Sequence, residues 1–322
     1  MTHTPELEFS YTPPPHWESR CADKVSLVHS TNWHRVLENG FGAKTLYVSE
    51  LESNAAFSIN IFKAGPFRIG YLGFPTGGLL NGTLSPALLD IIQLARLPLD
   101  LLRIQVSGFG PLLETDLPSL AVPETSITDL ERWELRKTPK FKRNVEKAQR
   151  NGIRPLLLND VTLAGTIYTL YRDTVLRHNS MLRYTEKYFR ALAELSQHCQ
   201  LIKCWVVIIE GRLSGFIVAA LEGGTAYYLH GAMNDSLRNY GGSAILFYCA
   251  LQWAQHLGAR QFNFMSSPPN QLSLVSYKEK MGGVTRQHHT YELHISPMRA
   301  KLFKMALWSH NLTRTALNQT KR

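Results

Sequence analysis

The segment R-N-Y-G-G-S-A, from Arg238 to Ala244, combines residue types that can hold a phosphate group. It stands between a strand-like run and an apolar helical run, so Gly241, Gly242 and Ser243 fall where a helix begins. Residues without bulky side chains let the backbone N–H groups at a helix amino terminus approach a pyrophosphate, and Arg238 would add positive charge. The segment therefore predicts a site for a phosphate-bearing donor; a plain glycine-rich turn before a helix is the alternative.

A basic stretch is a second candidate for binding anions. Residues 131–154 contain nine Lys or Arg residues against three Glu residues, and the part K-F-K-R-N-V-E-K-A-Q-R has helical character before Asn151-Gly152, a common helix stop. We select Lys142 and Arg143 as substrate-binding candidates in this stretch. A solvated, charged helix face is the alternative explanation.

The composition limits the class of protein. A chain of 322 residues with 44% hydrophobic and 19% charged residues is typical of a globular protein, and at roughly 150 residues per domain it suggests two domains. The 35 Lys and Arg residues exceed the 25 Asp and Glu residues, giving a formal net charge of +10. This excess favours an anionic partner, such as a phosphate-bearing substrate, RNA or an acidic membrane face.

Cysteine usage and the amino terminus indicate a compartment. The four cysteines include no C-x-x-C pair, so we expect free thiols in a reducing environment. The first residues, MTHTPELEFSYTPPP, lack a basic segment followed by an apolar one, and no stretch approaches the roughly 18 apolar residues of a spanning helix. We therefore expect a cytoplasmic protein.

The predicted elements repeat in order along the chain. The first half has a helix around 33–37, strands at 45–48, 56–62 and 68–72, a helix at 85–96 and a strand at 101–106. The second half has helices at 163–176 and 186–198, strands at 204–209, 216–221 and 226–232, a helix at 243–256, a strand at 261–265, a helix at 271–281 and a strand at 287–295. Gly223-Gly224 is a favoured two-residue hairpin turn between two of these strands. The shared order suggests two copies of one fold.

We therefore predict a mixed α/β, or α+β, protein with two tandem domains packed across a cleft. The divisions are an N-terminal domain (1–123) that ends in a proline-rich connector, a basic connector helix (124–158), a C-terminal domain that holds the donor (159–296) and a basic C-terminal helix (297–322). After Glu292 the chain has six basic residues and no acidic one. For the last helix, packing on its own protein and docking on an anionic membrane surface are the two interpretations.

The order of three strands, the Arg238–Ser243 segment, a helix, a strand, a helix and a strand resembles the acyl-CoA-binding half of the GNAT superfamily. The usual loop of that superfamily is Gln/Arg-x-x-Gly-x-Gly/Ala; Arg238 and Gly241 match it, and Ser243 departs from its last position. The resemblance implies acyl-CoA as a co-substrate and no tightly bound cofactor. It also implies that the N-terminal copy, which lacks such a loop, is a degenerate GNAT-like domain.

A closer resemblance is to the Fem-type aminoacyltransferases of peptidoglycan bridge formation and their acetyltransferase-like relatives, which carry two GNAT-like folds in one chain. The similar segments are K-F-K-R-N-V-E-K-A-Q-R-N-G-I at 140–153, Q-W-A-Q-H-L-G-A-R-Q-F-N-F-M at 252–265 and Y-K-E-K-M-G-G at 277–283. The resemblance covers most of residues 31–295. The family usually has an acidic residue where Asn263 stands, so a role that needs a carboxylate there does not transfer to this chain.

The resemblance implies transfer of an acyl or aminoacyl group to an amine, and this chemistry needs particular side chains. Lys278 is the candidate to stabilise the oxyanion that develops on the carbonyl, and Tyr277 is the candidate acid for the leaving group. Because neighbouring side chains on a helix point about 100° apart, we expect only one of the two to face the reacting carbon. His230 is the candidate base, with a hydrogen-bonded structural role as the alternative, and Glu210 is a weaker candidate in a hairpin turn.

Other polar and aromatic residues are weighed in the same way. Tyr228 is a candidate to line the acceptor site, although aromatic residues on strands usually belong to the core. His288, His289 and His294 have no partner cluster in the sequence, so we predict no metal site and interpret them as solvated strand positions.

The sequence leaves three functions open. The first is an N-acyltransferase that moves an acyl group from acyl-CoA to an amine on a sugar or a cell-envelope precursor. The second is a Fem-type enzyme that uses aminoacyl-tRNA, with the basic stretch on the tRNA backbone; such enzymes often insert a helical arm, and none is visible here. The third is a non-catalytic basic binding module. The expected partners are a small-molecule or lipid-linked acceptor amine, tRNA in the second case, and the inner face of an anionic membrane as a peripheral contact.

Overall fold

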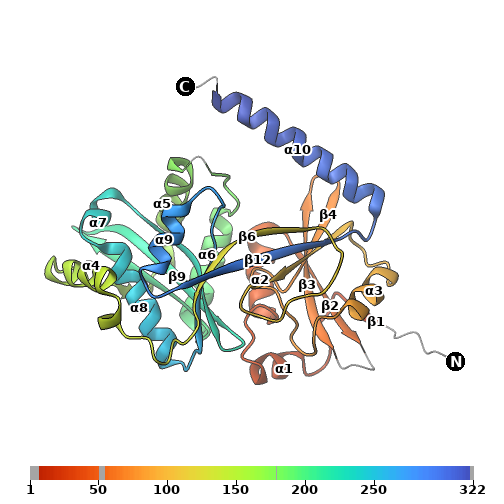
Figure 1. Cartoon of the computed structure of the whole chain (residues 1–322), viewed down its shortest axis with the longest axis horizontal. Coiled ribbons are helices and arrows are strands. Elements are labelled where there is room, and N and C mark those ends of the chain that lie inside the picture. The colour runs from red at the N-terminus through yellow and green to blue at the C-terminus, as the bar shows by residue number, and fades with distance from the viewer. Residues whose placement is uncertain (1–6, 51–54, 179, 320–322) are drawn as a thin grey trace.

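In the part of the chain that the structure describes, twelve strands form a single sheet (Figure 1). The computed structural model describes residues 7–50, 55–178 and 180–319, with side chains as far as Ser309. The strand order is β1-β2-β3-β4-β5-β12-β6-β11-β10-β9-β8-β7. N-terminal strands therefore form one side of the sheet and C-terminal strands the other. This confirms the mixed α/β class, and the two sides are treated below as the N-terminal and C-terminal halves.

The two halves repeat one arrangement of elements, as predicted. In each half three antiparallel strands are followed by a helix and by a fourth strand that runs parallel to the third. The elements of the N-terminal half are α2 (Thr31–Phe41), β2 (Lys44–Glu50), β3 (Ala56–Ala64), β4 (Phe67–Leu72), α3 (Pro86–Leu94) and β5 (Leu101–Val106). Those of the C-terminal half are α5 (Ala164–Arg177), α6 (Glu186–His198), β8 (Ile202–Ile209), β9 (Arg212–Glu222), β10 (Thr225–Met233), α8 (Gly242–His256) and β11 (Gln261–Ser266).

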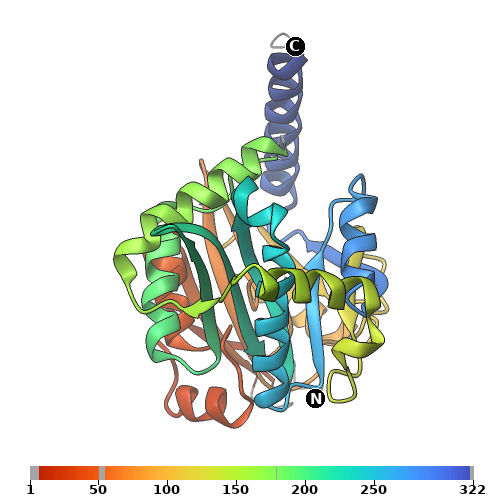
Figure 2. The same ribbon diagram turned by 90° about the vertical axis from the view of Figure 1, so that its left-hand side faces the viewer.

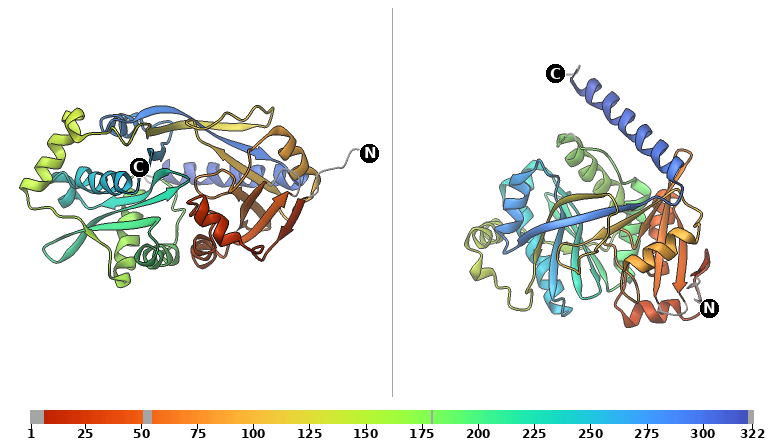
Figure 3. Two further views of the ribbon diagram at one scale, coloured as in Figure 1. Left: turned by 90° about the horizontal axis from the view of Figure 1, so that it is seen from below. Right: turned by 45° about the vertical axis from the view of Figure 1, so that its right-hand side comes forward.

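Two long strands join the halves. β12 (Val284–Leu293) pairs with β5 of the N-terminal half and also with β6 (Ser119–Ile127), which in turn pairs with β11. Both views in Figure 3 show β12 running from one half to the other. The boundary expected after residue 123 therefore falls inside β6, and the proline-rich connector expected at the end of the N-terminal domain already contains the start of this strand. Of the connector helix expected at 124–158, only α4 (Pro139–Arg150) is an α-helix.

Helices α2 and α6 meet where the halves join. Gly40 of α2 lies so close to α6 that a Cβ atom on it would come within 2.7 Å of the Tyr188 Cβ. A depression of about 460 Å³ beside this contact is lined by Gly40, Thr185, Glu186, Lys187 and Arg190. The two halves therefore contact each other through α2 and α6 as well as through the shared sheet.

A carboxylate forms a second link between the halves. One oxygen of Glu222, at the end of β9, accepts hydrogen bonds from the N–H groups of Leu27 (2.6 Å) and Val28 (2.8 Å), and the other accepts from the Ser26 hydroxyl (2.6 Å). Three donors of the N-terminal half are thus satisfied by one side chain of the C-terminal half.

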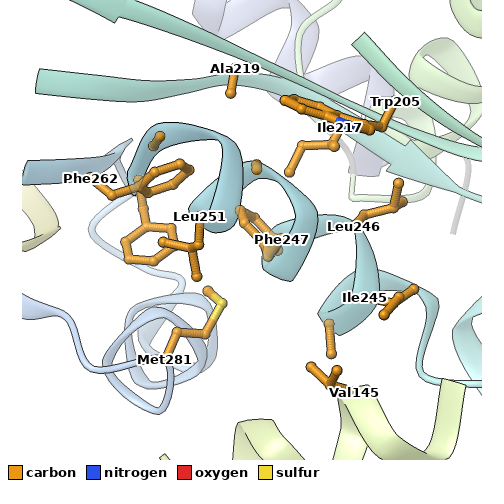
Figure 4. Close-up of a cluster of buried hydrophobic side chains, with 14 of the residues drawn as sticks. Val145, Trp205, Ile217, Ala219, Ile245, Leu246, Phe247, Leu251, Phe262 and Met281 are labelled. Carbon is orange, nitrogen blue, oxygen red and sulfur yellow. The ribbon is translucent and has the colours of Figure 1, made fainter. Parts of the chain in front are cut away.

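The C-terminal half has a core on each face of its sheet. Side chains alternate along a strand, so β9, which is buried on both faces, sends Phe216, Val218 and Ala220 toward α5 and α6 and sends Ile217, Ala219 and Leu221 toward α8. On the α8 side, Val145 of α4 lies against Ile245, and Met281 lies against Leu251 (Figure 4). The apolar character of α8 nearly all round is explained by this position between the sheet and two further helices.

The remaining elements are short, except for the C-terminal helix. They are β1 (Leu7–Ser10), α1 (Trp17–Asp23), β7 (Leu156–Leu157), α7 (Asp235–Asn239), α9 (Leu272–Glu279) and α10 (Pro297–Gln319). The sequence analysis missed β1, α1, β7 and α7. The expected C-terminal helix is α10; residues 320–322 of that division lie outside the described residues. Among the described residues, no helix has the length and apolar character needed to cross a membrane.

Candidate active site

The parallel pairing of β10 with β11 is short and stops at the centre of the C-terminal half. Only Thr225–Tyr227 pair with Gln261–Asn263. Beyond these residues β10 has an irregularity between Tyr228 and His230, and β11 has one between Asn263 and Ser266. The backbone groups that follow on the two strands are therefore no longer engaged with each other, which makes this point the natural place to look for a site.

The first turn of α8 lies at this point, and its glycines have a packing role. Gly241 is the N-cap residue with φ 80°, and a Cβ atom on it would lie 2.5 Å from the Asn144 carbonyl oxygen of α4. A Cβ atom on Gly242 would lie 2.1 Å from Leu237. Both glycines are thus required for close packing. Among the described residues, the N–H groups of Gly242 and Ser243 have no hydrogen-bond partner within the chain, so two donors at a helix amino terminus remain free for an anion.

Tyr277 closes over this turn from α9. Its hydroxyl donates a hydrogen bond to the Ser243 hydroxyl oxygen (2.9 Å). Its ring lies 6.3 Å from the ring of Phe247, which in turn lies 4.9 Å from the ring of Tyr228. Burial raises the pKa of Tyr277 above its usual value, although the hydrogen bond to Ser243 acts in the opposite direction. Three predicted site residues, Tyr228, Ser243 and Tyr277, are therefore neighbours.

Tyr228 lies mainly in the core. Its hydroxyl is 3.4 Å from the Gly231 carbonyl oxygen, and its half-buried ring packs against the core cluster under α8. Burial raises its pKa. This position matches the core alternative of the sequence analysis.

Lys278 points away from Tyr277 and is almost fully buried, with 3% of its surface exposed. Its ammonium nitrogen donates to the carbonyl oxygen of Met265 (2.8 Å) and to the Ser267 hydroxyl (2.7 Å). Burial lowers its pKa from 10.5 to about 7, although the carboxylate of Glu124 acts in the opposite direction. The two adjacent side chains thus contact different neighbours, as the helix geometry predicts.

A buried polar network around Glu124 supports the position of Lys278. Glu124 accepts hydrogen bonds from the Asn263 side-chain amide (2.9 Å), the Ser107 hydroxyl (2.6 Å) and the Gly108 N–H (2.9 Å). The Asn263 side-chain oxygen accepts from the Met265 N–H (2.7 Å), and the Met265 carbonyl accepts from Lys278. A continuous chain of hydrogen bonds therefore runs from the Glu124 carboxylate to the Lys278 ammonium.

His288 belongs to the same network, and its interpretation as a solvated strand position is wrong. It is 5% exposed, and its Nδ1 lies 3.4 Å from a carboxylate oxygen of Glu124. Burial acts to raise the pKa of Glu124, but the contact with His288 and the hydrogen bonds from Ser107 and Asn263 hold it below its usual value. The sequence analysis also missed Glu124. The only sequence signal was the absence of an acidic residue at Asn263, because Glu124 supplies a carboxylate beside that position from another strand.

His230 lies on the opposite face of the sheet from Tyr228. Tyr228 pairs with Ala219 and His230 pairs with Val218, so one extra residue between them reverses the alternation. The His230 Nε2 is 2.9 Å from the Tyr188 hydroxyl, and the ring lies among the aromatic rings of α6. Burial lowers its pKa to about 3, so the imidazole is neutral but too weakly basic to accept a proton efficiently near neutral pH. The geometry favours the structural alternative for His230. Glu210 is exposed in the β8–β9 turn.

The basic residues flank the first turn of α8 from two sides. Arg238, in the last turn of α7, is half-exposed and lies 3.5 Å from Asp235, which also pairs with Arg177 at 2.9 Å. On the other side, α4 crosses the end of α8 (Figure 2) and packs on it through its apolar face. Lys142 is 3.6 Å from Glu146, and Arg143 is exposed. The two anion-binding features predicted separately in the sequence are thus neighbours in space.

The corresponding place in the N-terminal half is filled by main chain. β4 and β5 also pair over only three residues, Ile69–Tyr71 with Leu101–Arg103. The loop after β4 folds back there: Gly77 donates to the Gly73 carbonyl (2.7 Å), and a Cβ atom on Gly77 would lie 2.2 Å from the Gln105 carbonyl oxygen. This packing supports the prediction that the N-terminal copy has lost a donor site.

The sequence match identifies the domain that contains this site. Residues 136–278 match the family described as the acetyltransferase (GNAT) domain. The chain carries a GNAT acetyltransferase domain. The match spans α4 to α9 and therefore includes the first turn of α8, Tyr277 and Lys278. The prediction of a GNAT-type acyltransferase is confirmed. No curated protein matches the chain significantly.

Solved structures confirm the tandem arrangement around the GNAT domain. FemX has a TM-score of 0.65 at 13% identity, over 92% of this chain and 99% of its own. The C-terminal domain of a putative lysylphosphatidylglycerol synthetase from Agrobacterium fabrum has a TM-score of 0.57 at 12% identity, over 90% and 95%. A tandem GNAT protein from the clavulanic acid biosynthesis pathway has a TM-score of 0.52 at 11% identity, over 90% and 99%. The resemblance to Fem-type tandem GNAT proteins is thus confirmed at the level of the fold.

Proposed function

We propose that this acyltransferase moves an acyl group from acyl-CoA to an amine on a sugar or another cell-envelope precursor. The observation that carries the proposal is the pair of free N–H groups of Gly242 and Ser243 at the start of α8. They lie between Arg238 and the basic helix α4, next to Tyr277 and where the β10–β11 pairing ends. Amides at a helix amino terminus, with cations nearby, suit the diphosphate of CoA.

The buried side chains suggest how the reaction proceeds. The neutral amine attacks the thioester carbonyl, forming the C–N bond and placing negative charge on the carbonyl oxygen. Collapse of this intermediate breaks the C–S bond, and the proton carried by the attacking nitrogen passes to the leaving sulfur, so the products are the amide and free CoA thiol. An ammonium group has three N–H donors. Lys278 uses two of them on Met265 and Ser267, so one remains for the oxyanion. Tyr277 contacts the first turn of α8 and not the neighbours of Lys278, so its donation to the leaving thiolate is an alternative to the oxyanion role of Lys278 and not a second contribution beside it. None of the predicted bases fits this geometry, so the acceptor must arrive as the neutral amine.

A donor bound as aminoacyl-tRNA is the second candidate, and the exposed basic face of α4 favours it. The fold is shared with FemX and with a domain of a lysylphosphatidylglycerol synthetase. One observation speaks against this candidate. None of the described helices next to the site forms an inserted helical arm; these helices are α4, α7, α8 and α9. We therefore favour acyl-CoA.

Ligand-dependent thermal stability tests the donor directly. Acetyl-CoA and longer acyl-CoAs should raise the melting temperature, because a ligand at 100 times its Kd stabilises the native state by about 2.7 kcal/mol. Ser243→Asp places a negative charge in the first turn of α8, where it favours the helix but repels phosphates, and Ser243→Asn is its neutral control. We expect Ser243→Asp to fold and to lose the shift, and Ser243→Asn to keep it.

The other candidates give different results in the same panel. The tRNA-dependent function would replace the proposal if charged tRNA raises the melting temperature, moderate salt abolishes this increase, and acyl-CoA causes no increase. Release of free CoA in the presence of an amine panel then measures turnover. Partner binding that survives Tyr277→Phe with Lys278→Ala, in a protein that turns over no amine, would show a non-catalytic binding module.

A further inference from the structure

The exposed side of α10 carries an apolar stripe. Met298, Leu302, Met305 and Trp308 follow one another at intervals of four, three and three residues, which places them on one side of a helix. Their exposed fractions range from 50% for Leu302 to 76% for Met298. Figure 1 shows that α10 projects from the body of the protein beyond its first turns. A contiguous apolar stripe in such a position is typical of an interaction surface.

The other side of α10 fixes the direction in which the stripe faces. Ala300 and Phe303 are buried against Ile69 and Leu101 at the base of the helix. Arg299 forms an ion pair with Asp100, and Lys304 lies 2.7 Å from Glu292. These contacts prevent the helix from turning its apolar stripe toward the protein. The stripe is therefore displayed outward in the folded state.

The charge on this segment selects the partner. Residues 293–322 contain six basic residues and no acidic one. Two of them, Arg299 and Lys304, are neutralised by Asp100 and Glu292, so the remaining four carry the excess positive charge of this segment. Pairing two copies of the chain through the stripe would bring two positively charged helices together, which like-charge repulsion opposes. An anionic lipid surface complements the charge, and it accepts the apolar stripe and a tryptophan at the headgroup boundary.

We propose that α10 docks on the surface of an anionic lipid bilayer, with Met298, Leu302, Met305 and Trp308 among the lipid chains and the exposed side chain of Lys301 at the headgroups. The helix lies on the membrane and does not cross it. The proposal is independent of the acyl donor, because its surface lies in a different half of the molecule from the first turn of α8.

Vesicle flotation with the full chain tests the proposal. The protein should float with vesicles of phosphatidylcholine that contain about one third phosphatidylglycerol, and at least tenfold less protein should float with phosphatidylcholine alone. Binding should fall severalfold between 0.1 and 0.5 M NaCl, because salt screens the attraction. Trp308→Glu and Met305→Glu should each reduce binding at least tenfold. Thr166→Glu, at an exposed position of α5, makes the same change in charge away from the stripe and should reduce binding less than twofold.

The opposite results would overturn the proposal. Equal flotation with neutral and anionic vesicles, an equal loss for Thr166→Glu and Trp308→Glu, or no flotation at all would each exclude docking through the stripe. A dimer in solution that Trp308→Glu converts to a monomer, without vesicle binding by the wild type, would assign the stripe to a second copy of the chain. Circular dichroism of each variant establishes that α10 and the fold are retained.

Discussion

Substituting Lys278 with Met tests whether the amine at the candidate site is neutral or charged. Burial lowers the pKa of this amine from 10.5 to about 7, a difference of 3.5 units. At 1.36 kcal/mol per unit, charging the amine in the folded protein is about 5 kcal/mol less favourable than in the unfolded chain. The substitution also leaves the Met265 carbonyl and the Ser267 hydroxyl without this donor, which costs about 1–3 kcal/mol at every pH.

The sign of the pH dependence follows from the protons bound in each state. Between pH 7 and 10.5 the unfolded chain holds a proton on Lys278 and the folded protein does not, so the free energy of unfolding of the wild type rises with pH. Lys278→Met lacks this contribution. We expect the wild type to gain about 1.4 kcal/mol per pH unit over the variant between pH 7 and 10 and to gain nothing below pH 6. Urea unfolding of both proteins at each pH measures the difference, and all other titrating groups cancel.

The advantage of the wild type over Lys278→Met in turnover should fall with rising pH, whereas its advantage in stability should increase. The oxyanion role needs the charged form, so the ratio of wild-type to Lys278→Met turnover should fall as the pH rises above 7. Loss of the cation should lower turnover about 10²–10³-fold at pH 6.5. An unfolding difference that stays flat from pH 7 to 10 would refute the lowered pKa. A turnover ratio that rises through pH 7 would instead assign Lys278 as a base.

Two carboxylates give further predictions. Burial raises the pKa of Glu222 to about 7 despite its three hydrogen bonds, so the free energy of unfolding of the wild type should fall by up to about 3 kcal/mol between pH 4.5 and 8. In urea unfolding, Glu222→Gln should be as stable as the wild type at pH 4.5 and more stable at pH 8. An equal pH dependence of stability in the two proteins would contradict the raised pKa. Glu124→Gln places an amide against the Asn263 amide and should cost about 1–3 kcal/mol of unfolding free energy. Because Glu124 acts to raise the pKa of Lys278, the pH above which turnover falls should be lower in the same variant than in the wild type. If turnover falls at the same pH in both proteins, Glu124 does not affect the pKa of Lys278.

Local sequence signals were sufficient for most elements of the fold. Gly223 and Gly224 both have positive φ, 55° and 83°, in a two-residue hairpin turn. Ser85 accepts a hydrogen bond from the Leu88 N–H at the start of α3, with proline at the first helical position. These elements depend on interactions within a few residues, so their residue types predict them.

Long-range features of the site had no such signal. The residue inserted between Tyr228 and His230 places His230 on the other face, and nothing in Y-Y-L-H-G-A marks a bulge. Pro123 made β6 resemble a connector, because proline rarely lies inside a sheet. The structure accommodates it next to the irregularity of β11 between Asn263 and Ser266. Glu124 follows directly, so the carboxylate that is linked to Lys278 through Asn263 and Met265 lay in a segment that the sequence did not assign to the site.

Because β12 lies between β5 and β6, the sheet cannot be completed until β12 has been synthesised. During synthesis on the ribosome, β5 emerges about 180 residues before its neighbour β12, at Leu101–Val106 and Val284–Leu293. Until then the backbone groups along that side of β5 have no strand to pair with, and an unpaired strand edge invites association with other chains. The nascent N-terminal half therefore depends on a strand that is translated after β6 to β11 to finish its sheet, and truncation before residue 284 should yield a fragment prone to aggregation.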